Sequence, residues 1–205
     1  MSNEIKVHWA LTHCEGTLGL KEIYEDDNYV YLVLEYQPKG SLLGQVVNNR
    51  GLTELQVRVV MEQLLLTADF MHTHGVVHRD IKLDNILINK IDEEHLDVKV
   101  ADFGLACFLP EEPMILLEDK CGTPGYVAPE ILRGHGYREK ADIFSLGAVL
   151  YNLLTGLYLF TGVNKEELLF NNKICNLVHV LPLVGMKCTP LCQDLLMNLL
   201  SLNAS

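Results

Sequence analysis

The chain has 205 residues, of which 49% are apolar and 21% are charged, a composition typical of a globular domain and unlike that of disordered chains. Its net charge is −11, and its 16 Lys and Arg residues are spread along the chain, which argues against a nucleic-acid partner. The six cysteines include no Cys-x-x-Cys pair and the N-terminus lacks an apolar signal segment, so we expect free thiols and a cytoplasmic protein.

The first half of the chain predicts a helix, a hairpin and a second, longer helix. Residues 2–12 have a helical pattern with Ser2 as a possible N-cap, and residues 20–36 contain two β-rich runs around an Asp-Asp-Asn turn. A long helix is expected from Thr53 to about His74, ending at Gly75. Its predicted apolar face consists of Leu55, Val59, Met61, Leu64, Leu65, Ala68 and Met71.

The second half begins with two short apolar runs, residues 85–88 and 98–101, on either side of an acidic turn. This pattern predicts a second hairpin. An irregular stretch is expected from Gly104 to about residue 130, and helical patterns dominate after it. The organisation is therefore a small β-containing N-terminal part followed by a larger helical part.

The uncharged segment 143–164 has about the length of a membrane-spanning helix. Polar residues and three glycines interrupt it, however, and no basic or aromatic anchors flank it. A central helix buried in a large domain is also apolar on all sides. The sequence favours this buried helix, with no membrane span.

Residues 72–85 place three histidines, two aspartates, a lysine, an arginine and an asparagine within one short stretch. A metal site is one hypothesis, because His72, His74, His78 and Asp80 are of ligand types. Residues two apart at a helix end point to different faces, so the geometry is poor. Surface histidines at a helix end are the simpler interpretation of His72 and His74.

Three motifs follow one another along the chain: "HRDIKLDN" from His78 to Asn85, "DFG" from Asp102 to Gly104, and "GTPGYVAPE" from Gly122 to Glu130. In this order, with a hairpin between the first two, they resemble the catalytic core of eukaryotic protein kinases of the serine/threonine type. The resemblance implies an α+β fold with a truncated small β lobe and a mainly helical large lobe. Residues 1–36 would be a remnant of the N-terminal lobe, and residues 37–205 a C-terminal lobe that is incomplete at its end.

Phosphoryl transfer needs a group to orient the attacking hydroxyl and cations to neutralise the phosphates. Asp80 can accept the hydroxyl proton, and Lys82 can approach the transferred phosphate from the same loop. Asn85 and Asp102 offer the oxygen ligands that Mg²⁺ prefers. The predicted catalytic residues are therefore Asp80, Lys82 and Asn85, with Asn85 and Asp102 as metal ligands and with ATP and Mg²⁺ as cofactors.

The resemblance also implies secondary roles for residues outside these motifs. Backbone groups of Glu35 and Gln37, next to Leu34 on the connector between lobes, would meet adenine. Leu87 and Ala101 would line the nucleotide pocket, next to Asp102. Lys82 and Thr123 are typical of the serine/threonine class of protein kinases rather than of the tyrosine class. Asp142 would hold the catalytic loop against the central helix.

Arg79 is expected to pair with the segment that follows Asp102, because the family often places a phosphorylated residue there. Residues 103–122 contain no Ser, Thr or Tyr. Glu118 and Asp119 occupy this region instead. We therefore hypothesise a permanent carboxylate partner for Arg79.

The resemblance also implies a glycine-rich loop and a lysine that would both lie upstream of Met1. This lysine would pair with a helix glutamate, which Glu4 matches. The arginine expected to pair with Glu130 would lie beyond Ser205.

Two functions follow. One is an ATP-dependent kinase acting on Ser or Thr of a protein substrate. The other is a catalytically inactive kinase-like module, a pseudokinase, that binds a regulatory protein or an active kinase.

Overall fold

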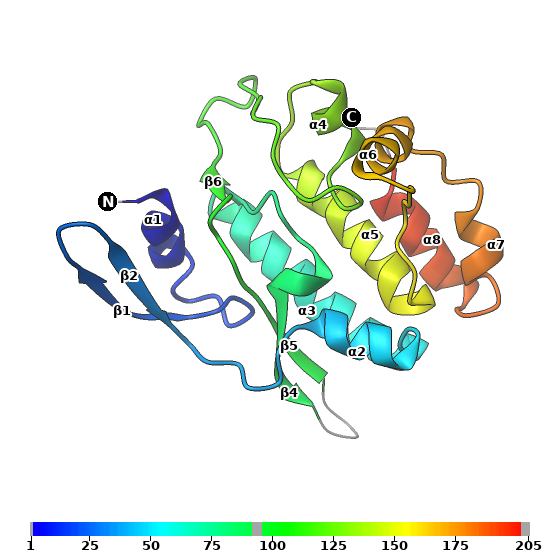
Figure 1. Cartoon of the computed structure of the whole chain (residues 1–205), viewed down its shortest axis with the longest axis horizontal. Helices are drawn as coiled ribbons and strands as arrows, with labels where there is room; N and C mark the ends of the chain where they lie inside the picture. Colours follow the sequence, from blue (N-terminus) through cyan, green and yellow to red (C-terminus); the bar gives the residue numbers. More distant parts are fainter. Residues whose placement is uncertain (1, 92–95, 202–205) are drawn as a thin grey trace.

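The N-terminal part of the fold is a short helix followed by a hairpin. The computed structural model describes residues 2–91 and 96–201. Helix α1 spans Asn3–Ala10, and its N-cap is the Ser2 side chain, as predicted. Strands β1 (Leu20–Glu25) and β2 (Val30–Leu34) pair antiparallel, which confirms the first hairpin (Figure 1). Asp26 shapes its turn by accepting hydrogen bonds from two backbone N–H groups, those of Asn28 and Tyr29.

Two helices follow the hairpin. Helix α2 (Leu42–Asn49) was not predicted from the sequence. Helix α3 (Glu54–Thr73) confirms the long helix and its Thr53 cap, which forms a capping box with Gln56. The prediction that Leu55 faces the core is wrong, because its side chain is 67% exposed. Leu55 lies two residues before the buried Val57, so it projects from the opposite side of the helix.

Short strands then frame the segment that carries most candidate site residues. Strands β3 (Val76–Val77) and β6 (Cys107–Phe108) pair antiparallel, with Val77 opposite Cys107. A 3₁₀ turn (Leu83–Asn85) leads into β4 (Ile86–Ile91), which pairs antiparallel with β5 (Leu96–Val100). The second hairpin is thus confirmed, although residues 92–95 of its acidic turn lie outside the described residues.

The helical part is built around α5 (Lys140–Thr155), which is buried along almost its whole length. Helix α5 packs against α3, α7 (Val180–Val184) and α8 (Pro190–Leu199), while α4 (Pro129–Arg133) packs against α6 (Lys165–Ile174) (Figure 1). Within residues 2–91 and 96–201, no helix is long and apolar enough to cross a membrane. The apolar 143–164 segment begins as the expected buried helix, but its last residues form a loop after Gly156.

The hydrophobic core lies mainly between α3, α5 and the β4–β5 hairpin. By contrast, most side chains of β1 and β2 are exposed. The molecule thus has a small strand-rich part and a larger helical part, which confirms the predicted α+β class.

Gly16 offers a test of how tightly the loop after α1 packs on α3. A Cβ at position 16 would lie 1.9 Å from the Thr67 hydroxyl oxygen, which donates a hydrogen bond to the Gln63 carbonyl at 2.7 Å. We expect Gly16→Ala to lower the free energy of unfolding by about 1–3 kcal/mol because of overpacking. Urea denaturation measures this loss.

Gly44, in α2, provides the matched control because an added Cβ would meet no atom within 4 Å. Gly44→Ala should raise stability by about 0.5–1 kcal/mol, since alanine restricts the unfolded chain and favours the helix. The double variant Gly16→Ala/Thr67→Ala should be more stable than the sum of its single effects. Strict additivity would contradict the predicted clash.

Candidate active site

The carboxylate of Asp142 fixes the loop that begins at His78. Asp142 lies in the first turn of α5 and is completely buried. It accepts hydrogen bonds from the backbone N–H groups of His78 at 2.8 Å and Arg79 at 2.9 Å. Arg79 adopts a left-handed backbone, with φ of 68°, which is unfavourable for a side chain other than glycine. The expected tie between this loop and the central helix is therefore present.

A third hydrogen-bonding partner of Asp142 was not expected. His72 Nε2 lies 3.0 Å from the Asp142 carboxylate, and the His72 side chain is only 12% exposed. The interpretation of His72 as a surface residue is therefore wrong, because α3 packs on α5 and turns this residue inward. His74 is exposed and stacks on Phe70. Among residues 2–91 and 96–201, no group of three or more His, Cys, Asp or Glu residues could hold a metal ion.

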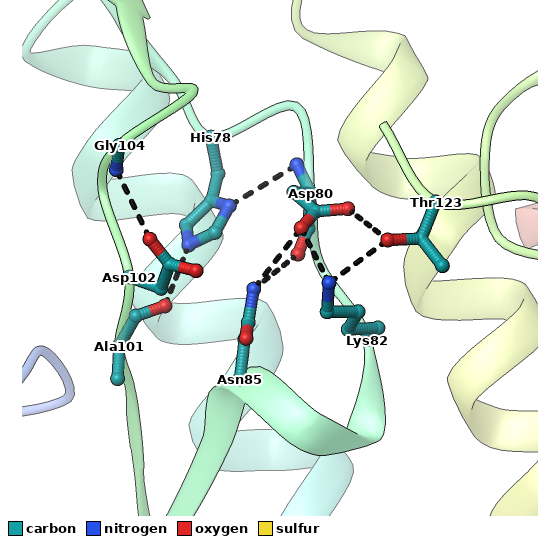
Figure 2. A network of polar contacts seen from close by, with 8 residues as sticks. All are labelled: His78, Asp80, Lys82, Asn85, Ala101, Asp102, Gly104 and Thr123. Carbon is teal, nitrogen blue, oxygen red and sulfur yellow. Dashed lines mark hydrogen bonds and ion pairs between the residues drawn. The ribbon is translucent and has the colours of Figure 1, made fainter. Parts of the chain in front are cut away.

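Asp80 lies at the centre of a compact polar cluster (Figure 2). The Thr123 hydroxyl donates to Asp80 Oδ1 at 2.6 Å, and the Lys82 ammonium donates to Asp80 Oδ2 at 2.7 Å. Lys82 also donates to the Thr123 hydroxyl oxygen at 2.9 Å. The Asn85 amide donates to the Asp80 backbone carbonyl at 3.0 Å. The structure thus brings the three predicted catalytic residues together, and the two short bonds to the Asp80 carboxylate come from Thr123 and Lys82.

His78 connects this cluster to the segment that carries Asp102. The Asp80 backbone N–H donates to His78 Nδ1 at 3.2 Å, and His78 Nε2 lies 3.1 Å from the Ala101 carbonyl (Figure 2). Because Nδ1 accepts a hydrogen bond, the proton must lie on Nε2, which donates to Ala101. The fully buried His78 ring therefore fixes Asp80 relative to the residue just before Asp102.

Asn85 and Asp102 present oxygen atoms that could bind a divalent cation. The Asn85 amide nitrogen donates to Asp80, which leaves Asn85 Oδ1 as the oxygen available for coordination. Asp102 has a left-handed backbone with φ of 65° and an exposed side chain. One Asp102 oxygen accepts from the Gly104 N–H at 3.3 Å, and its second oxygen is left for a ligand. These oxygens suit the hard ion Mg²⁺.

The predicted connector, Leu34 to Gln37, lies between β2 and α2. The Glu35 N–H donates to the Gly19 carbonyl at 2.8 Å. Of the two backbone groups of Glu35, only the carbonyl would therefore be left for an adenine. The Glu35 carboxylate pairs with Lys99 at 2.7 Å. Gln37 is buried, with 8% of its surface exposed, and its amide nitrogen has no hydrogen-bond partner among the described residues.

The remaining predicted nucleotide-binding residues lie next to this connector or after β5. A single β-bridge between Ser41 and Leu87 joins the start of α2, just after the connector, to β4. Leu34 and Leu87 are half-buried, and Ala101 is buried. The structure positions these side chains, but their role in binding a nucleotide stays a prediction.

Arg79 contacts the segment after Asp102, as hypothesised. Its Nη1 lies 3.2 Å from Asp119 Oδ2 and 3.4 Å from the Tyr137 hydroxyl, and its Nε donates to the Leu105 carbonyl at 2.6 Å. The Asp119 side chain is 82% exposed, so this ion pair contributes little by itself. The Tyr137 hydroxyl in turn donates to the Asp119 carbonyl at 2.8 Å. Backbone contacts therefore supplement the carboxylate partner of Arg79.

Helix α1 covers the other side of the Asp102 segment. The Asn3 amide donates to the Ala106 carbonyl at 2.6 Å, and the buried His8 ring packs edge-on against Phe103 at a centroid distance of 5.0 Å. Burial and the nearby Asp102 carboxylate raise the pKa of Glu4. Among residues 2–91 and 96–201, no basic side chain forms an ion pair with either Glu4 or Asp102.

From the sequence, His78 was considered only as a candidate metal ligand and Thr123 only as a sign of the serine/threonine class, although both contact Asp80. Thr123 is separated from Asp80 by 43 positions, so no local pattern links them. The only available signal was the position of each residue inside a recognisable motif. For His78, the metal-ligand hypothesis drew attention to the right residue for the wrong chemistry.

Replacement of Asp142 tests the anchor of the loop. In Asp142→Asn, one oxygen is exchanged for an NH₂ group that faces a backbone N–H donor, and a buried hydrogen bond is lost. We expect the free energy of unfolding to fall by about 3–5 kcal/mol. Asp69→Asn, at an exposed position of α3, should change it by less than about 0.5 kcal/mol. Equal effects of the two substitutions would show that Asp142 is not the anchor.

The His8 contact predicts a pH dependence of stability. Burial lowers the pKa of His8, so the unfolded chain takes up the proton first as the pH falls. The stability contribution is complete above the ordinary value of about 6.5 and is lost as the pH falls through the folded-state pKa. Thermal unfolding at pH values from about 7.5 to about 5.5 should show this loss, and His8→Leu should reduce it. An unchanged pH dependence in the variant would assign the loss to another group.

The comparisons with known proteins agree with the geometry. The family model described as "Protein kinase domain" matches residues 1–205. A relative from Plasmodium falciparum (isolate K1 / Thailand), called "Probable serine/threonine-protein kinase 2", is 42% identical over 174 residues, which cover 85% of this chain. The matched region is 33% of that relative, so the chain spans about a third of its length. With its motifs assembled around Asp80 and matched over its whole length, this chain belongs to the protein kinase family.

Proposed function

We propose that this chain transfers the γ-phosphate of ATP to a serine or threonine hydroxyl of a protein substrate. The observation that carries the proposal is the Asp80 cluster, in which one carboxylate accepts a hydroxyl at 2.6 Å and an ammonium at 2.7 Å. A hydroxyl group can therefore approach Asp80 Oδ1 next to a cation. This is the arrangement that phosphoryl transfer to an alcohol requires.

Asp80 would orient the substrate hydroxyl and accept its proton. The carboxylate is held from three sides, by Thr123, Lys82 and Asn85. Because its position is fixed before a substrate binds, little reorganisation is needed during the reaction. Asp80 is 8% exposed, so bulk water competes weakly for it.

Lys82 would stabilise negative charge on the transferred phosphoryl group. Its ammonium lies between Asp80 and Thr123 and its side chain is 19% exposed, so it can contact a ligand without leaving the loop. When bound, Mg²⁺ would neutralise the phosphates of ATP, and Asn85 Oδ1 and the Asp102 carboxylate would hold it. Lys82 and Thr123, together with the name of the Plasmodium relative, support serine or threonine as the acceptor.

A binding module without catalytic activity is the second candidate function. One observation favours it: burial and the Asp102 carboxylate raise the pKa of Glu4, and no described cation forms an ion pair with Glu4. Such a module would bind a regulatory protein or an active kinase through the helical part. Both candidates fit a reducing, cytoplasmic setting, since all six cysteines are free thiols.

Phosphate transfer distinguishes the two functions. Purified protein incubated with Mg²⁺ and radiolabelled ATP should label a generic serine-rich basic substrate, and Asp80→Asn should reduce the rate by about 10²–10⁴, the usual contribution of a positioned base. Asp194→Asn, at an exposed position of α8, is the control and should retain the parent rate. Circular dichroism establishes that the variants fold.

Two outcomes would contradict the kinase function. If the parent protein labels no substrate although it folds, the inactive binding module is the better assignment. If Asp80→Asn transfers phosphate at the parent rate, the activity comes from a contaminant or from another site. Labelling that depends on Asp80 would instead exclude the inactive module.

A further inference from the structure

Asn172 is unusual because it is the only residue of α6 that is buried. It is completely inaccessible to solvent, although the rest of the helix is exposed or half-buried. Buried amide side chains are costly unless their polar atoms are hydrogen-bonded. An apolar residue would have served simple packing at this position, so the partners of Asn172 indicate what the amide does.

Both ends of the Asn172 amide bind the backbone of one distant segment. Its Oδ1 accepts from the Gly125 N–H at 2.9 Å, and its Nδ2 donates to the Val127 carbonyl at 3.0 Å. The two partners have opposite polarity, so only one orientation of the amide satisfies both. Asn172 thus clamps residues 125–127 through two buried hydrogen bonds.

The clamped segment carries Thr123, which contacts Asp80. The N–H groups of Tyr126 and Val127 both donate to the Thr123 carbonyl at 3.1 Å, so residues 123–127 form one tight turn. The Ser145 hydroxyl of α5 donates to the Tyr126 carbonyl at 2.9 Å. The turn is therefore held by α5 on one side and by Asn172 of α6 on the other. Its free end presents the Thr123 hydroxyl to Asp80 (Figure 2).

Helix α6 is itself fixed at the end that carries Asn172. The Arg133 guanidinium, at the end of α4, donates to the carbonyls of Lys173 at 3.1 Å and Ile174 at 3.3 Å. These groups belong to the last turn of α6, whose carbonyls lack partners within the helix. Helices α4 and α6 lie side by side (Figure 1). Asn172 can therefore act as a fixed reference point for the turn.

We propose that Asn172 is a positioning residue for the protein substrate. It acts through the turn 123–127, which it holds next to Asp80. A peptide that delivers its hydroxyl to Asp80 must pass this turn, because the Thr123 hydroxyl already contacts the same carboxylate. A rigid turn provides a preformed edge for the residues next to the acceptor hydroxyl. The inference rests on the proposed kinase function and assigns substrate positioning to a residue outside its motifs.

Aspartate is the most informative replacement because it keeps the size of asparagine. In Asn172→Asp the carboxylate can still accept from Gly125, but it cannot donate to Val127 and instead places negative charge against that carbonyl. The loosened turn should weaken the contact of Thr123 with Asp80. The bonds of Lys82 and Asn85 to Asp80 do not involve the turn and should persist. The expected effect is therefore on substrate binding more than on the chemical step.

The test combines steady-state kinetics with amide hydrogen exchange. In Asn172→Asp, KM for a protein or peptide substrate should rise about tenfold, while kcat and KM for ATP should stay within about twofold of the parent values. The Gly125 amide should exchange about tenfold faster, because the side chain that accepts its hydrogen bond is no longer fixed by the bond to the Val127 carbonyl. If Asn172 had a purely structural role, its replacement would lower kcat and the overall stability together with any change in KM.

Asn171→Asp is the matched control, since Asn171 is the neighbouring asparagine of the same helix. Its amide donates to the Thr161 carbonyl at 2.7 Å, away from the turn, so neither KM nor Gly125 exchange should change. An unchanged substrate KM or unchanged Gly125 exchange in Asn172→Asp would overturn the proposal. If the parent protein transfers no phosphate, the kinase function fails and substrate positioning with it, whereas Gly125 exchange still shows whether Asn172 holds the turn.

Discussion

The buried Asp142 carboxylate is the constraint on which the rest of the site depends. It joins the N-terminal end of α5 to two successive backbone N–H groups, at His78 and Arg79. The helix dipole favours a negative charge at this position. In return, the carboxylate holds Arg79 in a left-handed conformation that costs free energy. The loop that carries Asp80 therefore takes its shape from the most buried helix of the protein.

The polar network extends from this anchor in two directions. Through His78, the loop is connected to the backbone just before Asp102, and through Asp80 it is connected to Thr123. Each link uses a buried or half-buried side chain whose donors and acceptors are matched. Buried networks of this kind specify one arrangement, because a partly satisfied alternative leaves unpaired polar groups. Three segments that are distant in sequence thereby acquire a common geometry.

The N-terminal part is joined to this frame in a different way. The loop after α1 exchanges backbone hydrogen bonds with Val100, through Leu18 and Gly16, and α1 reaches the Asp102 segment through Asn3 and His8. Most of the β1–β2 surface remains exposed. The helical part therefore has an extensive core, whereas α1 and the hairpin depend on a few contacts at the edge of the site.

The sequence by itself determined the local elements and the chemistry of the motifs. Caps and periodicity located α1 and α3, and the order of the three motifs indicated the family, because these signals are local in the chain. The exposure of Leu55, the burial of His72 against Asp142 and the two bonds of Asn172 were decided by tertiary structure. Each depends on which face of one helix meets a segment tens of residues away. Periodicity in one segment does not contain that information, because packing partners are chosen only when the chain folds.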